Sequence, residues 1–296
     1  MNKELLRKAL AEDLGSGDIT TRALIPKTLH GRAEIIAKES GILAGGLTVR
    51  EIFSLRDSSL KVVVHLRDGG RIRRGERVLA IEGRVAPILE AERVALNFLG
   101  RLSGIATLTR KFADKVRGTQ AKIFDTRKTT PLWRELEKGA VRSGGGENHR
   151  FGLWSEVLVK DNHWAAIWGI LDQTKCRYFG EKLRPIQKRR VPIEVEVRSL
   201  KELVHLLEGT FVPDRILLDN FSTRELQRAV LFVEGFYRVL EKRYGIRRKK
   251  PELEASGGVT LKNVRSIAAT GVERISIGRL THSAPALDFS LRLKRI

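Results

Sequence analysis

The pattern of apolar and polar residues changes near residue 120, and this change divides the chain into two parts. Residues 31–83 read as short strands with glycine-bearing turns between them. After residue 120, short apolar runs alternate with longer segments at helical spacing. The chain is therefore expected to hold a small sheet domain followed by a larger domain of repeated strand-helix units.

The first part begins with a helix predicted over residues 4–14, which ends at Gly15. The segment at 16–26 is expected to be a polar connector. From Pro87, apolar residues recur at helical spacing up to about residue 116. Ser103-Gly104 predicts a break that divides this region into two helices.

The second part contains six short apolar runs that predict strands. These runs are 121–124, 157–160, 193–197, 215–219, 252–255 and 274–277. Repeated strand-helix units indicate a parallel sheet, and six similar strands with short exits favour a barrel. No G-x-G-x-x-G follows any of these strands, which counts against a dinucleotide-binding sheet. The predicted domains are residues 1–110 and 111–280, with a tail at 281–296 that packs back on the first domain.

The composition argues against a disordered protein and against a small protein held together by disulfides. It has 296 residues, of which 42% are hydrophobic, and its one cysteine, Cys176, excludes an intrachain disulfide. The N-terminus is charged from Lys3 and is unlike a signal peptide. No run is long and apolar enough for a membrane span. A cytoplasmic protein without a membrane partner is expected.

The net charge of +21 is concentrated in two stretches, residues 175–190 and 238–250. Each stretch holds seven Lys and Arg residues against one Glu. A strongly basic chain raises the question of nucleic-acid binding, which would be steeply salt-dependent. Neither stretch has interleaved aromatic residues, and no nucleic-acid motif is found, so the charge is interpreted mainly as solvated surface.

Polar residues follow each predicted strand of the second part, where the chain leaves the strand. They are Arg127 and Lys128, Lys160 and Asn162, Glu194 and Glu196, Asp219 and Asn220, Ser256-Gly257-Gly258, and Gly278. The C-terminal ends of parallel barrel strands carry the chemistry, so these groups are expected to face one site for an anionic substrate. On its own, the Glu-Val-Glu-Val run at 194–197 is equally typical of a strand with a polar edge.

The glycine-bearing turns after the last two strands and the carboxylates Glu196 and Asp219 predict different parts of this site. Glycine-rich turns that lead into helices expose N–H groups and allow phosphate to approach closely. Glu196 and Asp219 suit Mg²⁺, its water ligands or sugar hydroxyls, because magnesium prefers carboxylate oxygens together with substrate phosphates.

Nine sequence blocks resemble the quinolinate phosphoribosyltransferase family, in order along nearly the whole chain. They are EDLGSGDITT, ERVALNFLGRLSGIAT, DTRKTTP, GGGENHR, KDNH, EVEV, LLDN, EASGG and ISIG. The resemblance implies an α/β fold with an incomplete seven-stranded β/α barrel and a smaller N-terminal α/β sheet domain. It also implies transfer of phosphoribosyl from phosphoribosyl pyrophosphate to quinolinate with decarboxylation, Mg²⁺ as cofactor, and a homodimer with shared active sites, or a hexamer.

The resemblance assigns roles to thirteen positions. Quinolinate would be bound by Arg127, His149, Arg150 and Lys160, with Arg93 from a neighbouring subunit. Lys128 and Lys160 would bind the sugar phosphates, and Glu196 and Asp219 would meet the ribose and magnesium. The phosphate would be bound by Ser256, Gly257, Gly258, Gly278 and His282. Of these, Lys128, Lys160, Glu196 and Asp219 would be catalytic.

Four bulky residues depart from the family pattern or from the size expected there. Leu132 and Trp133 stand where the family usually has glycine, and Trp164 and Trp168 follow the KDNH block. Leu132 and Trp133 are expected to change the shape of the start of the helix that follows, whereas Trp164 and Trp168 either narrow the pocket or pack structurally. A transferase for another pyridine or base remains an alternative, as does a Schiff-base aldolase that uses Lys160.

Overall fold

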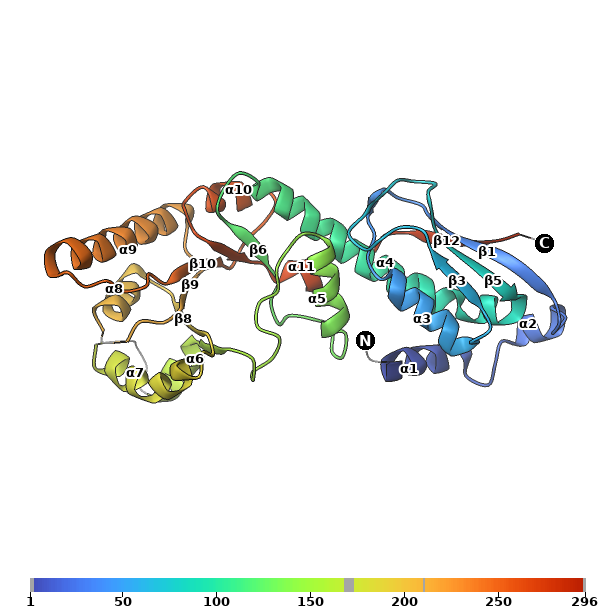
Figure 1. The fold of residues 1–296 in the computed structure, drawn as a ribbon, viewed down its shortest axis with the longest axis horizontal. Helices are drawn as coiled ribbons and strands as arrows, with labels where there is room; N and C mark the ends of the chain where they lie inside the picture. Colours follow the sequence, from blue (N-terminus) through green and yellow to red (C-terminus); the bar gives the residue numbers. More distant parts are fainter. Residues whose placement is uncertain (1–2, 168–172, 210, 295–296) are drawn as a thin grey trace. The chain divides into compact units, whose positions relative to one another are not determined.

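The computed structural model describes residues 3–167, 173–209 and 211–294, which belong to two compact units (Figure 1). The first unit comprises residues 1–111, 128–146 and 279–296. The second unit comprises residues 112–127 and 147–278. None of the helices in the described ranges has an apolar stretch long enough to cross a membrane.

The first unit is built on a four-stranded antiparallel sheet with the order β12-β1-β5-β3. Ile35, Leu79 and Ile81 are fully buried on this sheet and form its core together with residues of the helices. The strands of the unit are β1 (His30–Ala37), β3 (Lys61–Val64), β5 (Arg77–Arg84) and β12 (Phe289–Lys294), with a separate pair β2 (Gly41–Ile42) and β4 (Arg71–Ile72).

Helices of the first unit agree only partly with the sequence predictions. The unit contains α1 (Lys3–Leu14), α2 (Ile19–Leu24), α3 (Gly46–Arg56), most of α4 (Val85–Val116), α5 (Arg134–Ser143) and α11 (Arg279–His282). The helix predicted over 4–14 is confirmed by α1. The expected polar connector instead contains α2, because the Asp18 side chain caps it by accepting a 2.9 Å hydrogen bond from the Thr21 amide.

Helix α3 lies in a stretch that the sequence pattern assigned to strands. Its first turn is stabilised from a distance in the sequence, because Asp68 accepts hydrogen bonds of 2.9 and 3.0 Å from the amides of Gly45 and Gly46. A carboxylate at this end also complements the helix dipole. Gly45 has a φ of 96°, which a residue with a side chain adopts only with strain.

Helix α4 is continuous, so the predicted break at Ser103-Gly104 is wrong. Small residues are needed here for close packing within the first unit. A Cβ on Gly104 would lie 1.9 Å from the Pro285 carbonyl oxygen, and the Ser103 hydroxyl accepts a 3.1 Å hydrogen bond from the Ala44 amide. These two positions therefore let other segments approach the helix without interrupting it.

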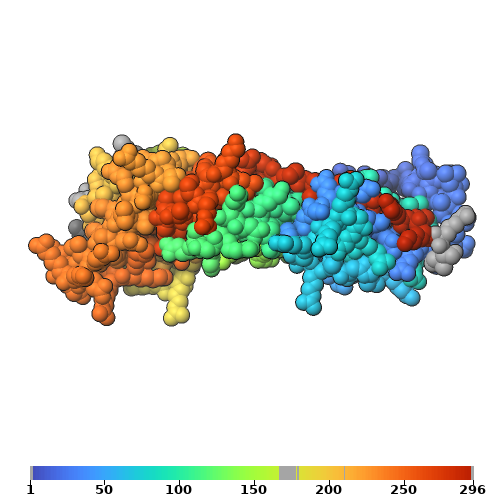
Figure 2. Space-filling view, turned by 90° about the horizontal axis from the view of Figure 1, so that it is seen from above, coloured from blue at the N-terminus to red at the C-terminus, as the bar shows by residue number. Residues whose placement is uncertain are grey.

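The C-terminal segment returns to the first unit as strand β12. It pairs antiparallel with β1, from Arg32 opposite Lys294 to Ala37 opposite Phe289. Figure 2 shows this segment, in red, against the blue and cyan surface of the same unit. The last strand of the chain, β12, thus forms one edge of the sheet, next to the first strand, β1.

The second unit contains a parallel sheet of six strands with the order β6-β11-β10-β9-β8-β7 (Figure 1). The six predicted strands are confirmed as β6 (Lys122–Phe124), β7 (Val157–Val159), β8 (Ile193–Val197), β9 (Arg215–Asp219), β10 (Glu252–Ser256) and β11 (Arg274–Ser276). Between them lie α6 (Asp161–Ile167), α7 (Gln173–Lys188), α8 (Leu200–Glu208), α9 (Thr223–Tyr244) and α10 (Val264–Ala268).

The seventh strand implied by the family resemblance is not part of the sheet in the described ranges, so the sheet has six strands. Glu147 makes a single parallel bridge with Phe124 of β6. Directly afterwards the chain turns, because the buried Asp125 carboxylate accepts hydrogen bonds from Asn148 Nδ2 at 2.6 Å and from the His149 amide at 2.9 Å. These side-chain bonds replace the ladder that would extend the strand.

Candidate active site

The parallel register brings the predicted strand exits of the second unit to one edge of the sheet. Ser256 is level with Asp219 on β9 and with Ser276 on β11, and Ser276 is level with Phe124 at the end of β6. The predicted residues that this edge brings together are Arg127, Lys160, Glu196, Asp219, Ser256, Gly257, Gly258 and Gly278. This is the arrangement that parallel α/β folds use for active sites.

The second unit contains two arginines whose positive charges act on one another, Arg127 and Arg150. Arg150 is only 7% exposed, and its pKa is lowered first by burial and then by the neighbouring charge of Arg127. Arg150 Nη1 donates to the Glu156 carbonyl oxygen at 3.3 Å. Two neighbouring guanidinium groups favour a ligand with more than one negative charge, because arginine binds carboxylates and phosphates through paired hydrogen bonds.

Lys160 and Glu196 form an ion pair between neighbouring strand exits, with 2.8 Å between Nζ and Oε2. The Glu196 side chain is 6% exposed and that of Lys160 is 42% exposed. A Schiff-base nucleophile needs its amine directed at the substrate, whereas here Nζ contacts the Glu196 carboxylate. The pair therefore favours an electrostatic role for Lys160 over the aldolase alternative.

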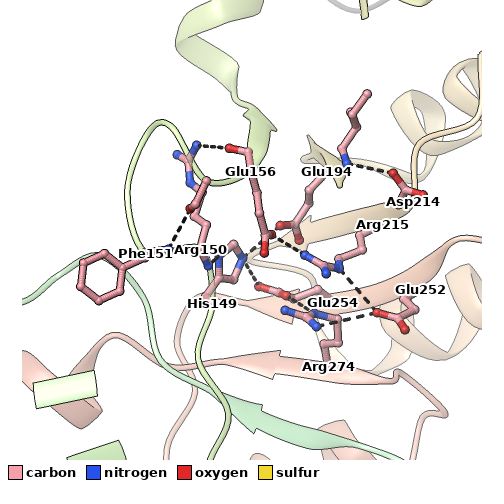
Figure 3. A network of polar contacts seen from close by, with 12 residues as sticks. His149, Arg150, Phe151, Glu156, Glu194, Asp214, Arg215, Glu252, Glu254 and Arg274 are labelled. Carbon is pink, nitrogen blue, oxygen red and sulfur yellow. Dashed lines mark hydrogen bonds and ion pairs between the residues drawn. The ribbon is translucent and has the colours of Figure 1, made fainter. Parts of the chain in front are cut away.

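His149 lies in a buried ionic cluster (Figure 3). Its Nε2 is 3.0 Å from Glu194 Oε2 and 3.3 Å from Glu254 Oε1. Arg274 Nε binds the other oxygen of Glu254 at 2.8 Å, and its guanidinium lies 3.5 Å from the centre of the Phe124 ring. The cluster draws charged side chains from β8, β10 and β11 into the interior of one unit.

The charges of this cluster shift three pKa values. Burial lowers the pKa of His149, but hydrogen bonds and charge from Glu194 and Glu254 outweigh it and raise the value to about 9. Burial raises the pKa of Glu194, and the charge of Glu254 adds to the effect. For Glu254, His149 and Arg274 overcome the effect of burial and hold the pKa at about 2.

Among the described residues, His149, Glu194 and Glu254 are the group whose possible metal-binding atoms lie within 4.8 Å of one another. The Arg274 guanidinium already supplies a positive charge to Glu254. Magnesium also prefers an all-oxygen environment, so this cluster suits an internal ion-pair network better than Mg²⁺. The carboxylates predicted to meet magnesium lie elsewhere, with Glu196 paired to Lys160 and Asp219 2.9 Å from Asn220 Nδ2.

Sequence analysis did not assign roles to Glu254 or Arg274, and it noted Glu194 only as a strand-exit group. A weak signal was present, since Glu194 and Glu196 alternate with apolar residues along β8, and Glu252 and Glu254 do the same along β10. Glu254 and Arg274 are directly in register on neighbouring strands, which spacing in the sequence does not reveal.

Three predicted site residues belong to the first unit. Arg93 is exposed on α4, Lys128 is exposed after β6, and His282 is exposed on α11. The Thr281 hydroxyl donates a 2.6 Å hydrogen bond to the Lys128 carbonyl oxygen, so the segments that carry Lys128 and His282 are joined.

A buried ion pair supports the loop after Lys128, and sequence analysis missed it. Glu137 of α5 is fully buried and lies 2.8 Å from Arg101 Nη2 of α4. It also accepts hydrogen bonds from the Thr130 amide at 3.1 Å and the Thr130 hydroxyl at 2.9 Å. Arg101 donates in turn to the carbonyl oxygens of Thr281 and Ala284. The pair thus holds in place the loop that follows Lys128, through Thr130, and the segment around His282, through Thr281 and Ala284.

Three of the four bulky residues that departed from expectation lie in the described ranges. Leu132 is 79% exposed with a φ of 67°, and Trp133 stacks on Phe98 at 4.1 Å between ring centres. Trp164 is buried. Trp133 is therefore a packing residue of the first unit, and Trp168 lies outside the described residues.

Comparisons with known proteins agree with this arrangement. The model of the quinolinate phosphoribosyl transferase N-terminal domain matches residues 18–103, and that of the C-terminal domain matches residues 105–292. The nicotinate-nucleotide pyrophosphorylase (carboxylating) of Mycobacterium leprae is 40% identical over 98% of this chain and 96% of its own length. Quinolinate phosphoribosyltransferase (decarboxylating) 2, mitochondrial, of Nicotiana glauca is 39% identical over 98% of this chain and 82% of its own.

Solved structures show the same similarity. The crystal structure of NadC from Streptococcus pyogenes superposes with a TM-score of 0.86 at 35% identity, covering 99% of this chain and 96% of that one. The nicotinate-nucleotide pyrophosphorylase of Francisella tularensis gives a TM-score of 0.85 at 33% identity, with 99% and 95% coverage.

Proposed function

The chain belongs to the quinolinate phosphoribosyltransferase family, and from this we infer its reaction and propose how its residues perform it. The protein transfers phosphoribosyl from phosphoribosyl pyrophosphate to quinolinate, and it yields nicotinate mononucleotide, carbon dioxide and pyrophosphate. This is a pentosyltransferase step of NAD biosynthesis, which we place in the cytoplasm. The observation that best supports quinolinate as the substrate is that the buried Arg150 feels the charge of Arg127, since a dicarboxylate matches two guanidinium groups.

The chemistry begins when the lone pair of the quinolinate nitrogen attacks C1 of the ribose and the bond from C1 to pyrophosphate breaks. The bond between the ring and its 2-carboxylate then breaks, carbon dioxide leaves, and the electron pair passes to the ring, which takes up a proton. The protein's contribution is mainly orientation and electrostatic stabilisation. Arg127, Arg150 and Lys160 would orient the carboxylates, and Glu196 and Asp219 would stabilise positive charge that develops on the ribose.

The remaining assignments concern the phosphate groups. Gly257 and Gly258 have φ values of 90° and 59° in the turn after β10, a conformation that exposes backbone N–H groups. Ser256, Gly257, Gly258 and Gly278 would bind phosphate oxygens, with Lys128 and His282 as further contacts. Mg²⁺, when bound, would neutralise charge on the leaving pyrophosphate. Because Lys160 already pairs with Glu196, we expect Glu196 and Asp219 to meet the ion through water.

The reaction and its metal requirement are tested together by measuring nicotinate mononucleotide formed from quinolinate and phosphoribosyl pyrophosphate. We expect product with Mg²⁺ and almost none in excess chelator, with recovery on adding Mg²⁺ back. Equal rates with and without chelator would refute the metal assignment. Nicotinate should be a poor substrate, because it has only one of the two carboxylates that Arg127 and Arg150 are proposed to bind. If it is used as efficiently as quinolinate, the decarboxylating assignment is wrong.

A homodimer with shared active sites is proposed from the exposed position of Arg93 on α4. Arg93→Ala and Lys160→Ala should each be inactive, but mixing them under subunit exchange should restore activity. Random pairing puts one intact site in about half of the dimers, so recovery should approach roughly a quarter of the wild-type rate. No recovery despite demonstrated exchange would place Arg93 outside a shared site. Either variant exchanged with itself is the control.

A further inference from the structure

Both basic stretches of the chain end at the edge where the strands of the parallel sheet begin. The first stretch, residues 175–190, ends just before β8, and the second, residues 238–250, ends just before β10. Arg190 of the first stretch and Lys249 of the second line the same cavity, which has a volume of about 300 Å³. The start of β9, which lies between β8 and β10, contributes to its lining. Charge that is divided in the sequence is therefore gathered at one place in the fold.

The carboxylates of this cavity are engaged by the protein itself. Asp214 Oδ2 accepts a 2.9 Å hydrogen bond from the Ile193 amide. Glu252 Oε2 lies 3.6 Å from Arg215 Nε and 3.7 Å from Arg274 Nη1 (Figure 3). These two acids therefore balance charges and amides of the sheet rather than the cations of the basic stretches.

Several exposed cations at this edge have no acidic partner among the described residues, whereas the adjacent Arg247 and Lys250 do pair with glutamates. The unpaired group is Lys188, Arg189, Arg190, Arg248 and Lys249. A cation in the last turn of a helix usually complements its dipole, and this accounts for Lys188 in α7. Arg248 and Lys249 lie beyond the end of α9, where the dipole no longer accounts for them.

A group of exposed cations around one cavity suits a ligand with closely repeated negative charges. Lysine and arginine side chains are the main ligands of nucleic-acid phosphates, and such contacts carry no sequence information. No aromatic side chain is among the described residues that line the cavity, which argues against stacking on bases and against an aromatic anchor from this side of a protein interface. The net charge of +21 attracts the same kind of ligand from a distance.

We propose that this edge of the sheet, around Arg190 and Lys249, binds the phosphate backbone of nucleic acid without reading its sequence. The amino-acid sequence, which favoured solvated surface for these charges, does not show that the two stretches share one cavity. The cavity lies at the edge opposite the strand exits, so binding there does not involve the candidate active site. The proposal does not depend on the proposed reaction.

Binding of a short labelled DNA duplex, followed by fluorescence anisotropy at increasing salt concentration and without substrates, tests the proposal. The variant Arg190→Asn/Lys249→Gln removes two charges, and asparagine tolerates the φ of 60° at position 190. We expect the slope of log K against log salt concentration to become shallower by about 0.9 for each lost contact, or about 1.8 in this variant. The matched control, Arg7→Gln/Lys27→Gln, removes two exposed cations of the first unit and should leave the slope unchanged.

Three outcomes would overturn the proposal: no binding by the wild type at low salt, equal changes in the two double variants, or strong preference for one DNA sequence. Arg190→Lys/Lys249→Arg keeps both charges and should bind like the wild type, which separates the loss of charge from a loss of folding. An RNA duplex of the same sequence is measured in parallel, and the tighter of the two identifies the nucleic acid. If polyglutamate competes as well as unlabelled duplex does, the surface fits an acidic protein and the proposal is wrong.

Discussion

Replacing Arg150 by alanine is expected to weaken quinolinate binding by roughly 2–5 kcal/mol, the usual cost of removing one partner from a buried charge pair. Arg150 is nearly buried, and its neighbour Arg127 would then face the dicarboxylate without it. The affinity for phosphoribosyl pyrophosphate should change much less, because its phosphates are assigned to other strand exits. Calorimetric titration of each substrate measures both effects.

The matched control for this experiment is Arg228→Ala, an exposed arginine on α9 in the same unit. It should leave both affinities unchanged, since surface substitutions usually have small effects. Arg150→Lys keeps the charge but loses the paired geometry of guanidinium, so it should fall between wild type and alanine. If Arg150→Ala weakens both substrates equally, Arg150 is a structural residue rather than a quinolinate ligand.

Replacing Glu137 by alanine is expected to lower the free energy of unfolding by roughly 3–5 kcal/mol, as for other broken buried ion pairs. The substitution removes the carboxylate from Arg101 and leaves the Thr130 amide and hydroxyl without their acceptor. Urea unfolding, followed by circular dichroism, gives the change from the shift in midpoint.

Glu12→Ala, on the exposed side of α1, is the control and should shift the midpoint little. Glu137→Gln keeps oxygen and nitrogen atoms near Thr130 but lacks the charge, so its loss should be smaller than that of alanine. Comparable midpoints for Glu137→Ala and Glu12→Ala would mean that the Arg101 pair contributes no net stability. A loss of phosphoribosyl pyrophosphate affinity in folded Glu137→Gln would connect the pair to Lys128.

The local sequence determined the six parallel strands and the exits that face one edge of their sheet. Short apolar runs are enough to locate the strands. Their parallel pairing follows from the helices that connect one strand to the next. Once the six strands are parallel, Lys160, Glu196, Asp219 and Ser256 are brought to the same edge without any further information.

Only the tertiary structure shows where long-range contacts override the secondary structure that the local sequence prefers. Helix α3 begins where Asp68, more than twenty residues away, binds the amides of its first turn. The sequence Ser103-Gly104 predicts a break, yet α4 continues through it. The small residue is needed there because the Pro285 backbone packs directly against Gly104. Beside β6, Glu147 makes only one bridge, and directly afterwards Asp125 accepts a hydrogen bond from the His149 amide.

The same reason explains why the buried networks escaped sequence analysis. His149 meets Glu194 and Glu254 across 45 and 105 residues of chain, and Glu254 meets Arg274 through strand register. Each of these residues alone is an ordinary charged residue in its local sequence, and burial is tolerable only when all of them are paired. Sequence therefore determined which residues leave the strands, and the tertiary structure determined which charges hold them in place.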